Sequence, residues 1–120
     1  MISINYRDGR PIYEQVRDGF RQLIITGVLP AGSKMPSVRE MAASLAINPN
    51  TIQRAYRELE AEGYIASVPG KGSFVAEQGE AILARREELL AHFKALLPEL
   101  RQVGTEKAAL VNLIEEEYDE

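Results

Sequence analysis

The stretch SVREMAASLAINPNTIQRAYRELEAEG, residues 37–63, decides the fold, because it holds the start and stop signals of two short helices. Ser37 stands three residues before Glu40, a spacing in which the hydroxyl caps a helix N-terminus and the glutamate reaches back to it. Apolar residues then recur at the spacing of one helix face, at Val38, Met41, Ala42 and Leu45. We therefore predict a short helix that begins at Ser37 and ends near residues 46–47.

A tight turn separates this helix from the next one. The tripeptide Asn48-Pro49-Asn50 is typical of a turn, and Asn50 is expected to cap the helix that follows. We expect that helix to span about residues 51–62, with Gly63 as its stop signal. Its buried face would carry Ile52, Ala55, Tyr56 and Leu59.

The residues before this stretch predict one further helix. Pro11 suits the first turn of a helix, where its missing N–H leaves no bond unmade. One helix face follows, made of Ile12, Val16, Phe20, Leu23 and Ile24. Gly27 is the expected C-cap, and residues 29–33 are expected to form a loop.

The residues after the stretch predict a β-hairpin. Residues 64–68 are rich in β-formers, residues 69–72 hold two glycines and a lysine, and residues 73–75 are typical of a returning strand. The order of helix, loop, short helix, tight turn, helix and hairpin is that of a winged helix-turn-helix. We therefore expect a mainly α fold with a small β-hairpin, its winged domain occupying residues 1–76.

Residues 77–120 predict a helical tail, because apolar residues recur there at helical spacing. Pro98 lies inside this pattern and is expected to kink or break the helix. Gly104 and Thr105 are expected to end it and to cap a last helix over about residues 106–118.

The tail also carries an apolar stripe that is too large to stay exposed on a small monomer. We expect this stripe to pair with that of a second copy, so that the tail makes a homodimer with two-fold symmetry. The residues predicted for dimerisation are Leu83, Leu89, Leu90, Phe93, Leu96, Leu97 and Leu100.

Charge is distributed unevenly along the chain, whose net charge is -4. Residues 1–76 carry nine Lys/Arg against seven Asp/Glu, whereas residues 77–120 carry five against eleven. The acidity therefore belongs to the tail, and the winged domain is mildly basic. Contact with DNA requires a local basic face, which this distribution permits.

Several function classes are disfavoured by the composition. The chain has no cysteine, and its one histidine, His92, lies beside Phe93 in a helical stretch, so we expect packing rather than a metal site. We find no catalytic constellation and no glycine-rich phosphate loop, and we expect neither an enzyme nor a cofactor. The sequence shows no membrane span and no secretory signal, and we expect a cytoplasmic protein.

Three groups of polar residues occupy positions where a winged helix-turn-helix contacts DNA. The later helix of the motif lies in the major groove with its N-terminal residues nearest the bases. Here those residues are Asn48, Asn50, Thr51, Gln53 and Arg54. The first turn of the preceding helix carries Ser37 and Arg39, which suit a phosphate.

The third group is the hairpin tip, made of Gly70, Lys71 and Gly72, which suits a phosphate or the minor groove. Each group taken alone also has an explanation that does not involve DNA, namely helix capping, solvation or an ordinary turn. Their order and spacing favour DNA, because all three must meet one face of a duplex.

Segments between residues 10 and 76 resemble the GntR family of bacterial repressors. The resemblance rests on PIYEQ (residues 11–15), on GVLPAGSKMPSVREMA (27–42), on NPNTIQRAY (48–56), on LEAEG (59–63) and on GKGSFV (70–75). The short tail resembles the YtrA subgroup, in which a pair of C-terminal helices serves dimerisation.

The resemblance implies residue roles in DNA binding. It implies a DNA contact for Arg39, recognition-helix contacts for Asn50, Thr51 and Gln53, and a wing contact for Gly70 with Lys71 beside it. Some family members carry arginine where this chain has Pro49 and Gln53, so their base preference does not transfer to it.

We therefore expect a dimeric, sequence-specific transcription regulator whose partners are double-stranded operator DNA and a second copy of the chain. Repression at a pseudo-palindromic operator is the expected mechanism. The alternatives are a protein–protein interaction module, an enzyme, and a repressor that responds to a small-molecule effector. The residues do not name such an effector.

Overall fold

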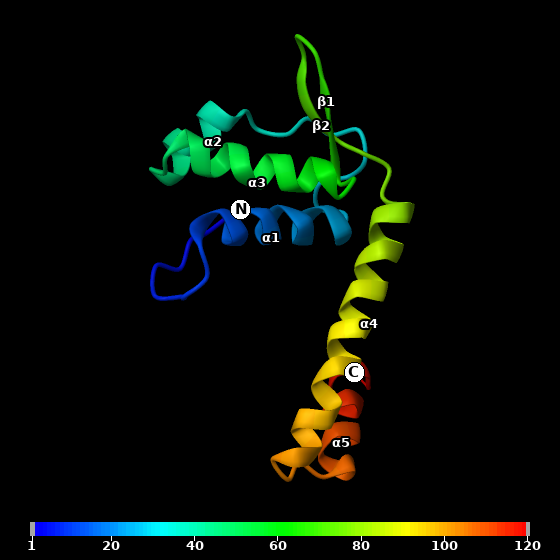
Figure 1. Cartoon of the computed structure of the whole chain (residues 1–120). Coiled ribbons are helices and arrows are strands. Elements are labelled where there is room, and N and C mark those ends of the chain that lie inside the picture. Colours follow the sequence, from blue (N-terminus) through cyan, green and yellow to red (C-terminus); the bar gives the residue numbers. More distant parts are fainter. Residues whose placement is uncertain (1, 120) are drawn as a thin grey trace. The chain divides into compact units, whose positions relative to one another are not determined.

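Seven elements follow the expected order in the computed structural model, which describes residues 2–119 (Figure 1). They are α1 (Ile12–Ile25), α2 (Val38–Leu45), α3 (Pro49–Ala61), β1 (Ile65–Val68), β2 (Gly72–Val75), α4 (Gly79–Gln102) and α5 (Lys107–Tyr118). The chain forms two compact units, the first ending at Leu83 and the second beginning at Ala84. The predicted fold class, a winged helix-turn-helix followed by a helical tail, is confirmed.

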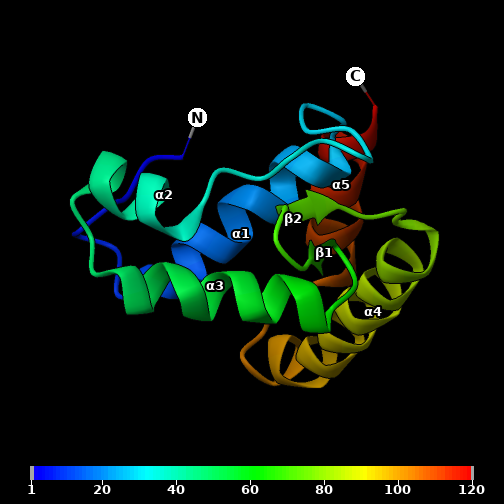
Figure 2. The ribbon, with the colours of Figure 1, turned by 90° about the horizontal axis from the view of Figure 1, so that it is seen from above.

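The core of the first unit lies mainly between α1 and α3, which Figures 1 and 2 show packed together. The buried apolar side chains of the two helices lie on the predicted faces: Val16, Phe20 and Ile24 from α1, and Ile52, Ala55, Tyr56 and Leu59 from α3. Ile12 and Leu23, also predicted for the α1 face, are half-buried. The rings of Phe20 and Tyr56 meet edge to face, with centroids 5.6 Å apart. This geometry brings the positive edge of one ring to the negative face of the other.

Ion pairs flank this core at a regular spacing. Arg17 Nη1 donates to Glu58 Oε1 at 2.6 Å, and Arg21 Nη2 donates to Glu62 Oε2 at 2.9 Å. Both pairs join residues 41 positions apart, so that one turn along α1 matches one turn along α3 and the helices run in the same direction. Burial alone would lower the pKa of Arg17, but its bonds to Glu58 and Asp18 raise that pKa above the ordinary value.

The start of α2 follows the predicted cap. Ser37 Oγ accepts a hydrogen bond from the backbone N–H of Glu40 at 3.0 Å, which satisfies one free donor of the first turn. The helix ends at Ala46, whose φ of 54° is left-handed. A small side chain keeps this unusual conformation tolerable and turns the chain towards α3.

The predicted start of α3 was wrong by two residues. The helix begins at Pro49, and Asn48 rather than Asn50 is its N-cap, with Asn48 Oδ1 accepting from the backbone N–H of Asn50 at 2.8 Å. The physical reason is that proline favours the first helical position, where its fixed φ suits the helix and its missing N–H costs nothing.

The wing is larger than the predicted hairpin. Strands β1 and β2 pair antiparallel, with Val68 opposite Gly72. The chain around Lys34, just after the loop expected at residues 29–33, runs beside β2. Met35 N donates to Ser73 O, and Val75 N donates to Ser33 O, each at 2.8 Å. The wing therefore has a third, short extended segment that ties it to the chain entering α2.

The tail departs from the expected structure at two positions. Helix α4 is not broken at Pro98 but continues to Gln102, so the expected break is wrong, while a kink there stays a prediction. Val103 N donates to Glu99 O at 3.1 Å, which shows helical bonding one turn after the proline. Thr105 is not the cap of α5, since Glu106 holds that position; the N–H of Thr105 instead donates to Leu100 O at 2.9 Å and closes the end of α4.

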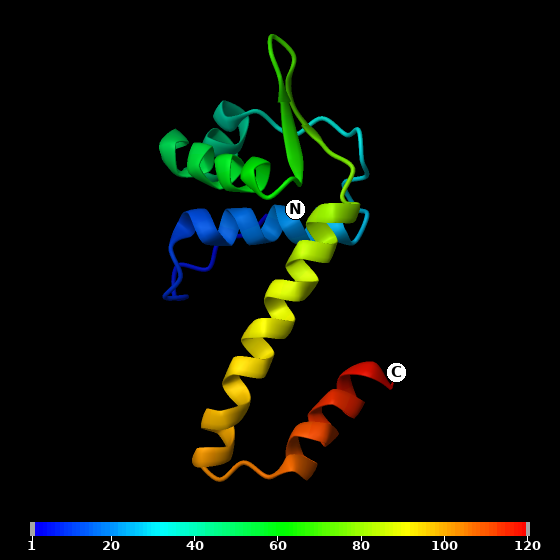
Figure 3. The same cartoon turned by 45° about the vertical axis from the view of Figure 1, so that its right-hand side comes forward.

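The second unit has no core of its own. Every described residue from Ala84 to Asp119 is exposed or half-buried. Figure 3 shows α4 and α5 diverging from the short connection between them. An isolated pair of helices that buries no side chain lacks the packing from which most helical stability in proteins comes.

The packing of the first unit predicts the effect of a core substitution. Phe20→Ala should lower the free energy of unfolding by about 3–5 kcal/mol, because it removes a fully buried ring and leaves a cavity. Val28→Ala is the control, since the Val28 side chain is exposed, and it should change stability by less than about 0.5 kcal/mol. Urea unfolding at one fixed protein concentration measures both. Similar losses in the two variants would contradict this core.

Candidate nucleic-acid interface

The first turn of α2 presents two of the predicted contacts. Ser37 is exposed, although its hydroxyl already accepts the capping bond from Glu40. Arg39 is exposed and forms no ion pair within residues 2–119. Its guanidinium is therefore available to an anion outside the chain.

The first two turns of α3 present the second group. Asn48, Asn50, Gln53 and Arg54 are exposed, and Thr51 is half-buried. Asn48 uses its side-chain oxygen as the helix cap, so that only its NH₂ group remains for another partner. Gln53 and Arg57 line a small hollow between α3 and the wing. Arg57, which the sequence reasoning missed, lies one turn beyond Gln53 on the same side of α3.

The wing tip is built by two glycines in conformations that L side chains rarely adopt. Gly70 has φ 74° and Gly72 has φ 115°. A Cβ on Gly72 would also lie 3.2 Å from Lys34 Cε, so glycine allows the Lys34 side chain to pass close to the wing. Lys71 between them is exposed, which leaves its ammonium group at the tip.

A hollow joins the wing to the start of α2, and its lining includes Lys34, Ser37 and Lys71. Tyr56 closes its inner side, where its hydroxyl donates to Pro36 O at 2.7 Å. Burial, and then the carboxylate of Glu40, raise the pKa of Tyr56, so that its phenol stays protonated. Through this bond Tyr56 fixes the chain entering α2.

Some arginines of the first unit form ion pairs with carboxylates, whereas other cations do not. Asp18 lies within 3.3 Å of three guanidinium groups, those of Arg10, Arg17 and Arg21. In the part of the chain that the structure describes, four other cations of α2, α3 and the wing have no such partner: Lys34, Arg39, Arg57 and Lys71. Apart from the exposed Arg7 before α1, the cations of the first unit that form no ion pair within residues 2–119 therefore lie on the helix-turn-helix and the wing.

Arg54 differs from these free cations. Its guanidinium carbon lies 3.7 Å from the centroid of the Tyr13 ring, and its Nε lies 3.6 Å from Glu58 Oε2. The side chain is nevertheless 58% exposed. Arg54 is thus held against α1 while it remains open to solvent.

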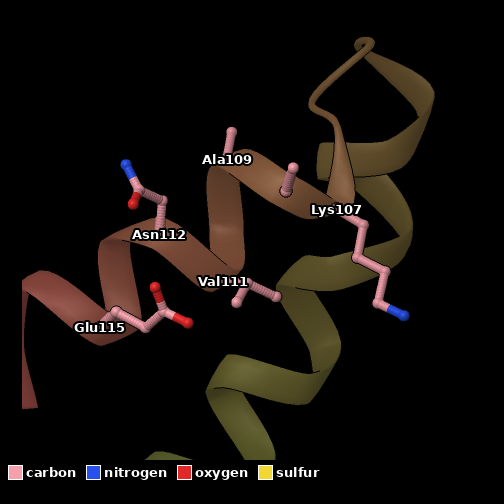
Figure 4. Close-up of a pocket in the computed structure, with 6 residues that line it drawn as sticks. Lys107, Ala109, Val111, Asn112 and Glu115 are labelled. Carbon is pink, nitrogen blue, oxygen red and sulfur yellow. The ribbon is translucent and has the colours of Figure 1, made fainter.

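The tail presents the predicted dimerisation residues mostly on its surface. Leu83, Leu89, Leu90, Phe93 and Leu96 are exposed, the last four by 46–59%, whereas Leu97 and Leu100 are half-buried. A shallow hollow along α5 is lined by Lys107, Val111, Asn112 and Glu115, among others (Figure 4). Its side chains are spread along one helix rather than converging on a point, unlike those of an enclosed ligand pocket.

Within residues 2–119, no three His, Cys, Asp or Glu side chains lie close enough together to hold a metal ion. The described helices also include none that combines the length and the apolar character of a membrane span.

Comparison with known proteins identifies the family. The model of bacterial regulatory proteins of the gntR family matches residues 12–75. The chain belongs to the gntR family. The matched range spans α1, α2, α3 and both strands of this gntR-family chain, and it includes every predicted DNA-binding residue.

Relatives of this gntR-family chain extend the match to the tail. The HTH-type transcriptional repressor YtrA of Bacillus subtilis (strain 168) is 36% identical over 118 residues, which cover 97% of this chain and 91% of that protein. A crystal structure described as a transcriptional antiterminator from Listeria monocytogenes EGD-e aligns with a TM-score of 0.78 at 33% identity, covering 100% of this chain and 90% of that one. The protein is therefore YtrA-like in both of its units.

A third similarity concerns the winged domain alone. The DNA-binding domain of AraR, crystallised with its operator ORE1, aligns with a TM-score of 0.55 at 28% identity. The alignment covers 63% of this chain and 93% of that one.

The geometry of this gntR-family chain predicts a phosphate contact at Arg39. Arg39→Ala should weaken binding to every DNA sequence and reduce the slope of log K against log salt concentration by about one, because one fewer counterion is released. Arg86→Ala is the matched control, since Arg86 is an exposed tail arginine that forms no ion pair within the described residues, and it should leave the slope unchanged. An unchanged slope for Arg39→Ala would exclude the phosphate role.

The position of Gln53 predicts a different kind of effect. Gln53→Ala should change base preference at one position of each half-site, because an amide pairs with the edge of one base. Competition between duplexes that differ at single positions measures this preference. The control is Gln22→Ala on the exposed side of α1, which should leave it unchanged. Uniform weakening across all duplexes would rule out base reading by Gln53.

Proposed function

We propose that this gntR-family transcription regulator is a homodimer that represses transcription by binding a pseudo-palindromic operator. The observation that carries the proposal is the presence of cations without an ion-pair partner on the helix-turn-helix and the wing, among them Arg39 on α2 and Lys71 at the wing tip. These elements are held in place by one core, so they can meet one duplex together.

Each element has its own role in the proposed complex. The α3 residues Asn50, Thr51 and Gln53 face base edges in the major groove, because residues at the start of a recognition helix lie nearest the bases. Ser37 and Arg39 bind a phosphate beside the start of α2. Gly70, Lys71 and Gly72 approach the adjacent backbone or minor groove, where absent side chains permit close contact.

Dimerisation is supported by the state of the tail. Large apolar side chains such as Leu90 and Phe93 are exposed by 59% and 46%, and the second unit buries none of its described residues. Pairing two tails would remove this surface from water at about 25 cal/mol per Å². A two-fold axis then presents two copies of α3 to two half-sites, which accounts for a pseudo-palindromic operator.

Repression is proposed from the similarity to YtrA, which is itself described as a transcriptional repressor. Operator binding is supported in the same way by the AraR domain that was crystallised with an operator. A bacterial regulator of this kind acts in the cytoplasm, where the promoter is. Regulation by a small-molecule effector stays a prediction.

Fluorescence anisotropy with the DNA upstream of the protein's own gene tests this function. We expect binding that is tighter than to a scrambled duplex, that weakens as salt concentration rises, and that saturates at two chains per duplex. Two chains per duplex on the upstream DNA would support a dimeric operator complex. Equal binding to both duplexes would contradict sequence-specific recognition there, and no binding even at low salt would favour a protein-interaction module.

The dimer itself is tested by substitutions at two neighbouring positions of α4. Phe93→Lys should shift the chain towards monomer in sedimentation analysis and weaken operator binding, because it places a charge in the apolar contact. His92→Lys introduces the same side chain at an exposed polar position and should do neither. If Phe93→Lys stayed dimeric, the proposed contact would be wrong.

A further inference from the structure

Arg54 leaves the recognition helix on a different side from Gln53. Gln53 lines the hollow between α3 and the wing, whereas the Arg54 guanidinium lies against Tyr13 of α1. A recognition helix in the major groove has a phosphate backbone along each flank. The position of Arg54 on the α1 flank therefore suits a phosphate rather than a base edge.

We propose that Tyr13 and Glu58 are positioning residues that hold Arg54 ready to bind a DNA phosphate. The inference rests on the DNA-binding function proposed above and adds two residues to it. Neither residue needs to touch DNA, because each acts through the orientation of the Arg54 guanidinium.

The stacked geometry leaves the hydrogen-bonding groups of Arg54 available. The guanidinium carbon lies 3.7 Å from the centroid of the Tyr13 ring, which is van der Waals contact for a cation over the face of an aromatic ring. A guanidinium is planar, and its N–H donors point outward in that plane. Stacking on Tyr13 therefore restrains Arg54 through the face of the guanidinium and leaves the donors at its edge.

Glu58 also helps to hold the Arg54 side chain, but it forms no hydrogen bond that would occupy the guanidinium. Its Oε1 accepts a 2.6 Å bond from Arg17 Nη1, whereas its Oε2 lies 3.6 Å from Arg54 Nε, beyond hydrogen-bond distance. Glu58 is thus anchored mainly by Arg17 and attracts the Nε side of Arg54. No hydrogen bond within residues 2–119 uses the terminal nitrogens of Arg54, so both are open to a phosphate.

This arrangement reduces the entropy lost on binding. An unrestrained arginine must give up many rotamers when it clamps a phosphate, whereas a stacked one has already given up part of them. Loss of the ring should therefore weaken DNA binding without removing the contact. The expected loss is roughly two- to fivefold, the range of an exposed cation–π contact.

A double-mutant cycle on the full-length protein tests the inference. Operator affinity is measured by anisotropy at three salt concentrations for Tyr13→Leu, Arg54→Ala and the double variant. Arg54→Ala should lower the salt slope by about one, whereas Tyr13→Leu should lower affinity roughly two- to fivefold with the slope unchanged. In the Arg54→Ala background, Tyr13→Leu should have no further effect.

Three controls separate positioning from general stability. Tyr13→Phe keeps the ring and should retain wild-type affinity, although it loses the hydroxyl bond to Glu14. Tyr6→Leu removes a 72% exposed tyrosine whose ring makes no cation–π contact within residues 2–119, and it should have no effect in either background. Thermal unfolding of every variant shows whether a loss of binding reflects a loss of fold.

The outcomes are distinct. Equal weakening by Tyr13→Leu with and without Arg54 would overturn the positioning role, as would loss of affinity in Tyr13→Phe with its unfolding temperature unchanged. If the unmodified protein failed to bind the operator, the proposed function would fail and this inference with it. Normal binding by the unmodified protein with additive losses would overturn only the inference.

Discussion

The packing of α1 against α3 is the constraint on which the proposed interface depends. The recognition helix has a buried face that includes Ile52 and Leu59, and this face is covered by apolar residues of α1 that include Phe20. Burying one face of a helix settles which residues remain outside, because positions three and four apart move together. The same contact that stabilises the unit therefore decides that Asn50 and Gln53 point away from it.

The α1–α3 contact is also connected to the other two elements of the proposed interface, the start of α2 and the wing. Tyr56 packs its ring against Phe20 and donates its hydroxyl to Pro36 O, next to the cap of α2. The chain entering α2 runs beside β2 through the bonds of residues 33–35, and Ser67 of β1 donates to the Glu60 carboxylate on α3. Hydrogen bonds therefore connect the start of α2, the recognition helix and the wing to one another.

Local signals predicted most of the fold. The capping serine, the apolar periodicity and the glycine-rich hairpin tip each act within a few residues, and all three predictions hold in the structure. The errors also have a local cause, namely that two signals competed. At residues 48–50 the sequence offered two asparagines as caps, and proline decided between them by its preference for the first helical position.

Features that depend on distant residues could not be predicted in the same way. The third extended segment of the wing joins residues about 40 positions apart, and the stacking of Arg54 on Tyr13 joins residues 54 and 13. No local pattern marks either pairing. A signal for the second was nevertheless present, because Tyr13, Arg17 and Arg21 recur every four residues on α1, as do Arg54, Glu58 and Glu62 along α3 and its C-cap. Two such rows with matching spacing are expected where two helices run side by side.

The net charge of -4 and a DNA-binding function are compatible once the charges are followed to their partners. Asp18, Glu58 and Glu62 are engaged by arginines along the α1–α3 contact, so they do not oppose the free cations near the wing. At physiological ionic strength, screening over about 8 Å confines the influence of each remaining charge to its own neighbourhood. The salt dependence of binding should then follow the number of phosphates contacted, not the charge of the chain.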